Sequence, residues 1–308
     1  MHPAFSVLFF TVTSGFGYGF MLCLIVLQQL GLLDMGREEF LLWSGVAFAL
    51  FTLGLMSSTL HLANPKNAWR SFVRFRTSWL SREGVFAIVG YPVLGAYVAA
   101  VWFGQTGLWL HVLALVCIAL ILVLLYCTAM IYASLKTIPQ WHNKLVPPIF
   151  LTLGVSSGLV CVGLAKGWQH AELSITALFF LGLSAILKLQ YFSSLGKPTR
   201  SSINTATSFS QASVTLFDAG HSSQNFLQRE FVYEVGPKTT ALARKASLTM
   251  AFLAPLVLIA LLWSKTVTDY TQLAAWAIVI SLYVGLLLER WLFFVEAKHV
   301  VRHYYDKS

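Results

Sequence analysis

The chain has 308 residues, of which 57% are hydrophobic and only 11% are charged, with a mean hydropathy of +0.72. Soluble domains carry about 25% charged residues, so this composition excludes a soluble protein and indicates an integral membrane protein. A formal charge of +9 would favour nucleic acid as a partner of a soluble chain. In a membrane protein the basic residues report orientation instead, and we expect no nucleic-acid binding.

Eight apolar runs are long enough to cross a bilayer, which takes about 20 predominantly apolar residues in a helix. They predict an all-α integral membrane protein, with one membrane domain over 1–308 built as a bundle of eight transmembrane helices. The predicted spans are residues 5–30, 40–63, 84–104, 108–131, 148–166, 173–195, 246–264 and 272–295. The first span is rich in glycine, serine and threonine, which allow close helix approach and predict an interior position. No basic region precedes this span, so we expect a retained helix and not a signal peptide. The short connections after the third and fifth spans predict two tight helical hairpins.

The Lys and Arg residues are divided unevenly between the two sides that eight spans define. The side with the N-terminus, the loops after the second, fourth and sixth spans and the C-terminal tail holds 17 of them, with Arg290 counted in the tail. The other side holds Arg37, Lys166 and Lys265. The positive-inside rule therefore predicts cytoplasmic termini in a bacterial cytoplasmic (inner) membrane. Lys188 lies within the sixth span, where we expect it to snorkel to the cytoplasmic surface.

The segment 196–245 is the sizeable extramembrane stretch of the pattern, on the predicted cytoplasmic side. Its first half is rich in serine and threonine, and about 50 residues bury too little surface for an independent core. It is either a solvated linker or a surface that orders against a soluble partner, and we favour partner docking.

Metal and haem ligand sets are not visible in the sequence. The four cysteines lie inside apolar runs and form no CxxC pair, which excludes a recognisable iron–sulfur motif. Buried haem needs axial ligands that face each other at matching depth, whereas His61 and His111 lie at opposite sides of the predicted membrane. We therefore expect no metal, no haem and no covalently bound cofactor in this chain.

Two ionisable residues at one membrane boundary are candidates for proton chemistry. His61 ends the second span and Glu83 opens the third, on the same predicted side. Imidazole titrates near neutral pH and can exchange a proton with a quinone oxygen. Together the two would form a proton path from the cytoplasm to a quinone headgroup. The ordinary alternatives are an interfacial histidine that bonds a headgroup or carbonyl, and a glutamate that stabilises a helix N-terminus.

Basic and aromatic residues fill the segment between these two spans. Arg70, Arg74 and Arg76 lie in NAWRSFVRFRTSWL, which is typical of an interfacial helix attracted to anionic lipid or of a docking surface for an acidic partner. Trp79 is a candidate for packing on a ring, and Arg82 for anchoring a lipid phosphate.

Near the C-terminus, Glu289 and Arg290 are adjacent opposite charges at the end of the eighth span. We expect them to pair with neighbouring helices in a structural role.

Four stretches together resemble the membrane anchor subunits of dimethyl sulfoxide reductase-type complexes. They are MHPAFSVLFFTVTSGFGYG, GLMSSTLHLANPKNAWRSFVRFRTSWLSREG, IYASLKTIPQWHN and ERWLFFVEAKH. The resemblance is closest to the branch that anchors cytoplasmic sulfite:quinone oxidoreductases (sulfite dehydrogenases). It extends from end to end with helix count and order intact, and it is weakest in the loop after the sixth span.

The resemblance implies a three-part complex with a molybdenum bis-pterin (molybdopterin) catalytic subunit and a ferredoxin-like subunit that carries four iron–sulfur clusters. The anchor would hold the site for ubiquinone or menaquinone, generally without haem. In this family the histidine and the acidic residue at the positions of His61 and Glu83 are linked to quinol handling. The expected quinone site consists of Ser58, His61, Arg76, Trp79, Arg82 and Glu83, and the chain should also contact membrane lipid.

The basic loops on the predicted cytoplasmic side favour a cytoplasmic catalytic module, hence sulfite oxidation that feeds quinone. One alternative is the anchor of a dimethyl sulfoxide or other S- or N-oxide reductase that oxidises quinol. A secondary transporter built from inverted repeats is another alternative, although Pro92 and Pro255 are the only helix breakers deep in spans and no paired halves are visible. The third is an inert anchor without a quinone site.

Overall fold

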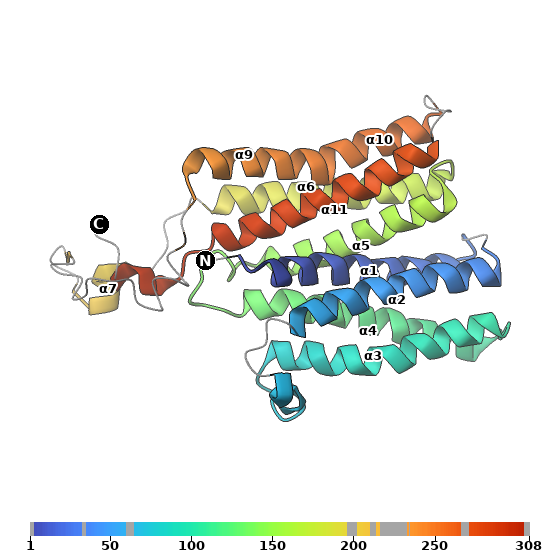
Figure 1. Ribbon diagram of the computed structural model, residues 1–308, viewed down its shortest axis with the longest axis horizontal. Helices are drawn as coiled ribbons and strands as arrows, with labels where there is room; N and C mark the ends of the chain where they lie inside the picture. The colour runs from blue at the N-terminus through green and yellow to red at the C-terminus, as the bar shows by residue number, and fades with distance from the viewer. Residues whose placement is uncertain are drawn as a thin grey trace.

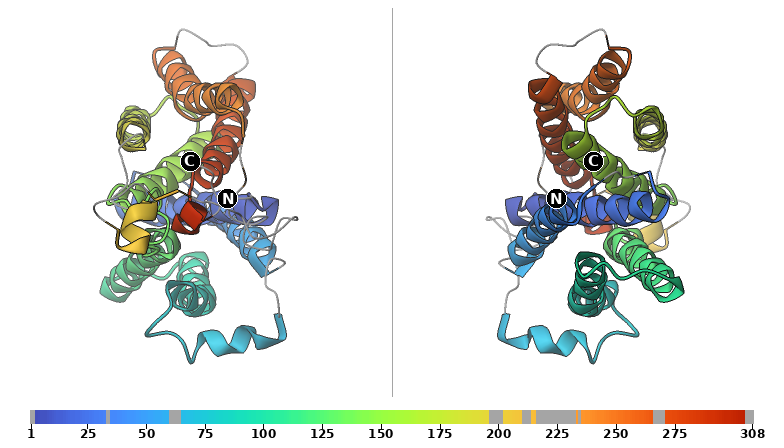
Figure 2. Two further views of the ribbon diagram at one scale, coloured as in Figure 1. Left: turned by 90° about the vertical axis from the view of Figure 1, so that its left-hand side faces the viewer. Right: turned by 90° about the vertical axis from the view of Figure 1, so that its right-hand side faces the viewer.

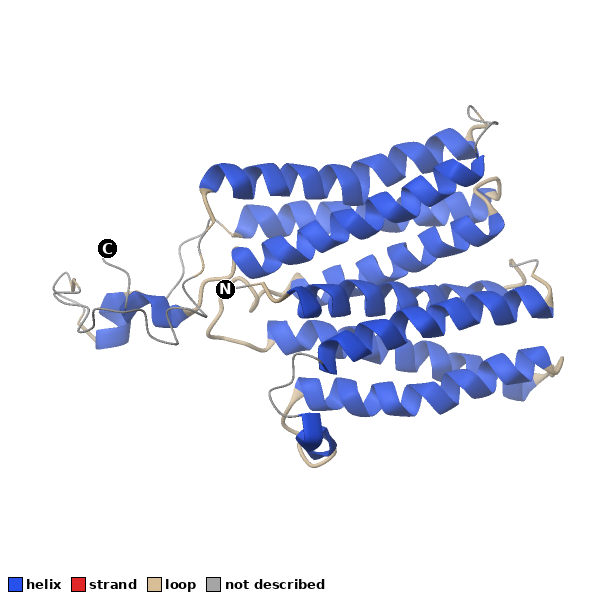
Figure 3. Ribbon diagram, viewed as in Figure 1, coloured by secondary structure: helices blue, strands red, loops and turns tan. Residues whose placement is uncertain are grey.

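The computed structural model describes residues 3–32, 35–59, 65–195, 202–209, 214–215, 233, 235–265 and 271–304. Within these residues all regular secondary structure is helical (Figure 3). Eight of the helices are long and apolar enough to cross a membrane. The prediction of an all-α bundle with eight candidate spans is therefore confirmed.

The eight spans pack side by side along one axis (Figure 1). They are α1 (Phe5–Gln29), α2 (Arg37–Thr59), α3 (Trp79–Trp102), α4 (Leu108–Ala133), α5 (Val146–Lys166), α6 (Ala171–Ser194), the continuous helix α9–η2–α10 (Pro237–Leu248, Thr249–Leu253, Ala254–Trp263) and α11 (Thr271–Val295). Among the described residues, the shorter helices outside the spans are η1 (Pro65–Ser71), α7 (Ile203–Thr207) and η3 (Val300–Tyr304). One end of the bundle holds the first residues of α1, the last residues of α11 and the short helices η1 and α7 (Figure 1). We call it the η1 end.

The helix α1 lies in the centre of the bundle, where it contacts α2, α4, α5 and α11 (Figure 2). A Cβ atom added to Gly19 would lie 1.8 Å from the carbonyl oxygen of Gly154 on α5. On another face of α1, a Cβ atom added to Gly17 would lie 2.4 Å from the backbone nitrogen of Phe51 on α2. Small residues thus bring α1 against two neighbours at backbone contact, which confirms the interior position expected for the first span. The hairpins α3–α4 and α5–α6 are also confirmed.

A π-helical segment, η2, interrupts the seventh span just before Pro255. Proline lacks a backbone N–H and its ring displaces the preceding turn, so a local change of helix geometry is expected there. The hydroxyl of Ser281 on α11 donates a hydrogen bond of 2.8 Å to the carbonyl of Met250 within this segment. The neighbouring helix thereby satisfies part of the backbone that the distortion exposes.

Two spans begin more than one helical turn earlier than the sequence predicts. The helix α3 begins at Trp79 and not at residue 84, with the side chain of Ser78 accepting a hydrogen bond from the backbone N–H of Ser81. The helix α9 begins at Pro237 and not at residue 246, so the last part of the predicted loop 196–245 is helical. In both cases the first two turns contain charged residues, at which a search for apolar runs stops. Apart from residues 202–209, 214–215, 233 and 235–236, the rest of that loop lies outside the described residues, and partner docking stays a prediction.

The prediction that Lys188 snorkels to the surface is wrong. Its side chain is 1% exposed and forms an ion pair with Glu289 of α11, which is itself fully buried. Arg290, at 4% exposure, places its Nε atom 2.6 Å from the other carboxylate oxygen of Glu289. A buried carboxylate on the neighbouring helix offers the ammonium a closer partner than the surface does. The pairing expected with a neighbouring helix is confirmed for Glu289, whereas Arg290 pairs with Glu289 of its own helix. Arg290 lies in α11, not in the tail.

Candidate functional site

A cavity of about 520 Å³, which we call the α2–α3 cavity, lies between α2, α3 and the segment that joins them. Sites for small organic molecules have volumes of about 300–1,000 Å³ and mostly apolar linings with a few polar groups. Apolar side chains such as Met56, Leu80 and Ile88 line this cavity. Its polar lining consists of Thr52, Ser58, Thr59, Asn67, Arg70, Arg74, Ser81, Glu83 and Tyr91.

Glu83 supplies a buried carboxyl group to the wall of the α2–α3 cavity. It lies just over one turn inside α3 and is 3% exposed. Its carboxylate accepts a hydrogen bond from the hydroxyl of Thr128 on α4. Ser78 is the residue that caps this helix, and the hydrogen bond of the Glu83 carboxylate is to Thr128 of another helix and not to a backbone N–H of the first turn. A buried carboxyl beside an apolar cavity can instead hold a proton and exchange it with a ligand.

A second polar pair lies in the same cavity, farther from the η1 end. The hydroxyls of Thr52 on α2 and Tyr91 on α3 are 2.8 Å apart and form a hydrogen bond. The ring of Tyr91 packs on Phe51 with centroids 5.3 Å apart and on Phe48 at 6.1 Å. This packing orients the phenol, so its hydroxyl can serve as a fixed hydrogen-bonding group for a ligand.

The segment between α2 and α3, which the structure describes over residues 65–78, is called the joining segment below. It covers the cavity at the η1 end with basic and apolar side chains. Arg70 and Arg74 line the cavity. Trp69, Phe72 and Val73 are 61%, 55% and 72% exposed. Its described residues, 65–78, form the short helix η1 followed by turns, not the single amphipathic helix that the sequence suggests. The helix η1 lies across the direction of the spans and outside the bundle (Figure 2). Exposed apolar and basic side chains suit either a membrane interface or a partner surface.

Of the residues predicted to form a quinone site, Ser58 and Glu83 line the α2–α3 cavity. His61 falls in residues 60–64, which lie outside the described residues, so its predicted role is untested. In the sequence it follows the cavity residue Thr59 by two positions. Thr128, which the sequence analysis missed, is 45 positions from Glu83, and no pattern in the sequence connects the two.

Arg76, Trp79 and Arg82 do not belong to the cavity lining that the described residues form. The guanidinium of Arg82 lies 4.1 Å from the ring centroid of Trp79. It also donates hydrogen bonds of 3.0 and 2.7 Å to the carbonyls of Phe75 and Arg76. These contacts attach the first turn of α3 to the joining segment. Quinone binding by the three residues stays a prediction.

A second cavity, of about 330 Å³, lies at the opposite end of the bundle. Its side chains include Gln29, whose amide bonds the hydroxyl of Tyr97 at 2.8 Å and Nδ1 of His111 at 2.5 Å. These groups satisfy one another, and no carboxylate is present in the lining that the described residues form. The α2–α3 cavity is therefore the stronger candidate for proton-coupled chemistry.

Within the described part of the chain, no three His, Cys, Asp or Glu residues are grouped closely enough to hold a metal ion. All four cysteines are buried free thiols. The chemistry that these residues offer is hydrogen bonding and proton exchange at a membrane cavity.

Comparison with known proteins gives two matches that extend over most or all of the chain. The family model of the DMSO reductase anchor subunit matches residues 1–295. The chain is 32% identical, over an alignment 329 positions long, to a sulfite dehydrogenase subunit of Allochromatium vinosum. That alignment covers 99% of this chain and 99% of the relative.

Proposed function

Because the chain belongs to the DMSO reductase anchor subunit family, we propose that it is the quinone-reactive membrane anchor of a molybdenum and iron–sulfur oxidoreductase complex. Electrons pass between an iron–sulfur subunit and the membrane quinone pool through this chain. Substrate chemistry takes place on a catalytic partner that carries the molybdopterin cofactor.

The observation that carries the proposal is the buried carboxyl of Glu83 in the wall of the α2–α3 cavity. Reduction of a quinone to a quinol takes up two electrons and two protons, and oxidation of a quinol releases the same. The cavity volume of about 520 Å³ and its apolar lining suit a quinone ring and the start of its tail. Ser58 and the pair Thr52–Tyr91 supply hydrogen bonds for the carbonyl oxygens, while Glu83 exchanges the proton. Ubiquinone and menaquinone fit this description equally.

The η1 end is proposed to face the bacterial cytoplasm. The loops on that side hold most of the Lys and Arg residues, in agreement with the positive-inside rule. An iron–sulfur partner that docks on the joining segment would then lie directly over the α2–α3 cavity. The loop 196–245 provides further surface for the same partner.

Sulfite is the proposed electron donor, because the chain is 32% identical to a sulfite dehydrogenase subunit along 99% of its length. Electrons then flow from sulfite, oxidised by the catalytic partner, to quinone. A second candidate is an S- or N-oxide reductase, which the name of the matching family favours. The purified complex distinguishes them, since it reduces quinone with sulfite in one case and oxidises quinol with dimethyl sulfoxide in the other.

The variant Glu83→Gln in the assembled complex tests the role of the site. Glutamine keeps the volume and the acceptor for Thr128 but cannot exchange a proton in the same way. We expect quinone-linked turnover to fall by about hundredfold or more, the range of general acid–base catalysis. Turnover with an artificial acceptor that takes electrons from the partner subunits should stay at the wild-type level, as should assembly.

The control is Glu38→Gln, which changes an exposed glutamate in the first turn of α2 at the opposite end of the bundle. His61→Ala should reproduce the loss if this residue shares the proton exchange. Quinone turnover close to wild type in Glu83→Gln would refute the assignment of the site.

A further inference from the structure

We propose that the cavity of about 330 Å³ at the end of the bundle opposite the η1 end binds the headgroup of a phospholipid, with its phosphodiester on Arg37. We call it the far cavity. The last turns of α1 and α3, the first turns of α2 and α4 and the loop that joins α3 to α4 form its lining. The site is separate from the quinone site, so the inference goes beyond the proposed function and does not depend on it.

Arg37 brings an unpaired positive charge to the far cavity. It is the first residue of α2, it is exposed, and its side chain lines the cavity. Its guanidinium forms no ion pair within the described part of the chain, and Glu39, two positions along, pairs with Lys166 at 3.4 Å instead. The lining that the described residues form also contains no carboxylate. The ligand that complements this wall is an anion, and a guanidinium matches the oxygens of a phosphate well.

Two glycines of the loop between α3 and α4 shape the wall opposite the interior of the bundle. A Cβ atom added to Gly104 would lie 2.3 Å from Nη2 of Arg37, and the φ angle of Gly104 is +66°, a value that favours glycine. Glycine at this position thus leaves the space that the guanidinium occupies. Gly107, with a φ angle of +100°, is the N-cap of α4, and no side chain caps this helix. The uncapped N-terminus of α4 therefore adds a second attraction for an anion in the cavity that Arg37 lines.

The opposite wall of the far cavity offers an acceptor. The side-chain oxygen of Gln28 is buried and has no hydrogen-bond partner among the described residues. Buried acceptors require a donor, which an ionised phosphodiester cannot supply. The ammonium of an ethanolamine headgroup and the hydroxyls of a glycerol headgroup can. Gln29 holds the rest of this wall in place through its bonds to Tyr97 and His111. The site thus fits a headgroup that carries a donor beside its phosphate.

Aromatic and apolar side chains indicate that the far cavity lies at the membrane surface. Trp102 ends α3 and Trp109 lies in the first turn of α4, and both are exposed. Exposed tryptophans are typical of the headgroup level of a bilayer. Leu108, His111 and Leu115 follow one another at the spacing of one face of α4, and both leucines are exposed. Because His111 lines the cavity, this apolar face provides a surface for the acyl chains of a lipid whose headgroup lies there.

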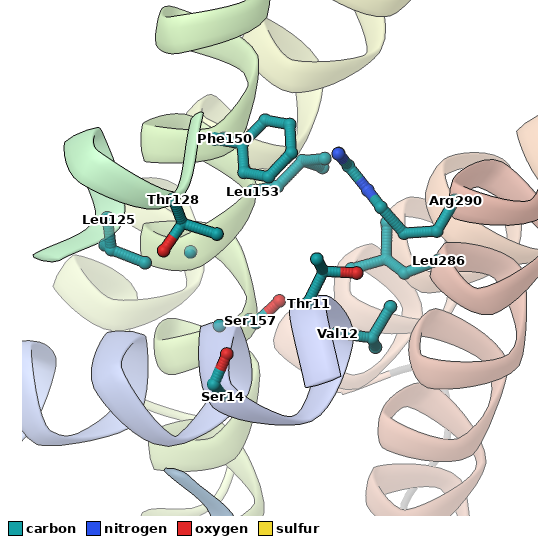
Figure 4. A pocket seen from close by; sticks show the side chains of 12 residues that line it. Thr11, Val12, Ser14, Leu125, Thr128, Phe150, Leu153, Ser157, Leu286 and Arg290 are labelled. Carbon is teal, nitrogen blue, oxygen red and sulfur yellow. The ribbon is translucent and has the colours of Figure 1, made fainter. Parts of the chain in front are cut away.

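A guanidinium also borders a small cavity in the centre of the bundle, between α1, α4, α5 and α11 (Figure 4). There, however, Nε of Arg290 lies 2.6 Å from the carboxylate of Glu289. The volume of this cavity is about 30 Å³. A water molecule needs about 10–15 Å³ of such space, so about two water molecules fit. The central cavity lacks both the unpaired charge and the room that a headgroup requires, and the far cavity has both.

Native mass spectrometry of the full-length chain in detergent, titrated with phosphatidylglycerol, tests the charge at this site. Arg37→Gln should weaken binding of the first lipid by about tenfold or more, the usual effect of losing a hydrogen bond to a charged group. Arg37→Lys keeps the charge and should bind with an affinity between the two. The control is Lys265→Gln, which removes an exposed positive charge at the same end of the bundle but outside the lining of the far cavity, and should bind as the wild type does. Equal affinities in Arg37→Gln and Lys265→Gln would overturn the site.

The variant Gln28→Leu tests the headgroup. The wild-type chain should bind phosphatidylethanolamine and phosphatidylglycerol more tightly than phosphatidylcholine, because the trimethylated ammonium of choline has no hydrogen to donate. In Gln28→Leu the three lipids should bind about equally, since the first two lose their bond to the side-chain oxygen. An undiminished preference in this variant would contradict the assigned orientation of the headgroup.

Inorganic phosphate separates a lipid from a soluble anion as the ligand. We expect it to leave the first lipid bound to the wild-type chain at concentrations at which added phosphatidylglycerol exchanges with that lipid. Displacement by phosphate at the same concentrations would overturn the lipid assignment, because the site would then recognise the anion alone. None of these outcomes affects the quinone site, which turnover of Glu83→Gln tests separately.

Discussion

The buried cluster of Lys188, Glu289 and Arg290 provides a stability prediction in which the net charge left in the cluster decides which of two variants loses more free energy of unfolding. The cluster contains two cations and one carboxylate, and each of the three side chains is at most 4% exposed. Lys188→Met leaves Glu289 paired with Arg290 and thus a neutral pair. Glu289→Gln leaves two buried cations without a carboxylate. The two substitutions remove the same ion pair but have opposite effects on the net charge of the cluster.

Removing one partner of a buried ion pair costs about 3–5 kcal/mol when it strands a charge. We expect Glu289→Gln to lose free energy of unfolding in this range, because Lys188 and Arg290 are both stranded. Lys188→Met should lose no more than about 1–2 kcal/mol, since an apolar replacement of one ion is often close to neutral. The control is Glu39→Gln, which removes the partly exposed pair with Lys166, 3.4 Å long, and should cost less than about 1 kcal/mol.

The native thiols provide the assay. All four cysteines are buried and free, so a fluorogenic thiol reagent reacts with the detergent-solubilised protein only as it unfolds. At about 2–4 °C per kcal/mol, Glu289→Gln should lower the apparent unfolding temperature by roughly 6–20 °C. Lys188→Met should shift it by a few degrees. Equal shifts for the two variants would refute the reasoning, because loss of packing and not charge imbalance would then determine the cost.

Two further predictions concern packing and orientation. Gly19→Ala should destabilise the bundle by about 1–3 kcal/mol or more, because the added Cβ would lie 1.8 Å from the backbone of Gly154. The control Gly182→Ala, whose Cβ meets open space, should leave the unfolding temperature unchanged. Equal thermal shifts for the two variants would contradict the α1–α5 contact. Lys66→Cys and Thr106→Cys lie in exposed positions at opposite ends of the bundle. A membrane-impermeant maleimide should label Thr106→Cys in intact cells and Lys66→Cys only after the membrane is opened, and the reverse pattern would invert the proposed orientation.

The sequence was sufficient to predict the eight spans, because the thickness of the bilayer sets the length of an apolar helix. The interior position of α1 also followed from its small residues, and Gly17 and Gly19 do contact backbone. The helix starts were less predictable. Trp79 and Pro237 begin helices whose first two turns contain charged residues, and such turns can extend beyond the apolar core of a membrane.

Side-chain partners were the part that the sequence could not provide. Lys188 looked like a snorkelling lysine because a one-dimensional pattern does not reveal that Glu289 faces it from α11. The partner of Glu83 was equally hidden, since Thr128 is one hydroxyl among many in an apolar span. Arg82 was expected at a ligand site, and its hydrogen bonds to Phe75 and Arg76 instead connect two segments of the chain. Such contacts depend on how helices are arranged, which apolar periodicity leaves open.

The central claim is that quinone binds in the α2–α3 cavity, and photoaffinity labelling of the assembled complex tests it most directly. An azido-quinone is irradiated in the complex, and the labelled peptides of this chain are identified by mass spectrometry, with excess unlabelled quinone as competitor. We predict competed adducts on α2 and α3 at cavity residues such as Met56, Leu80 and Ile88. Competed adducts at Tyr97 and His111, in the cavity at the opposite end, would contradict the account.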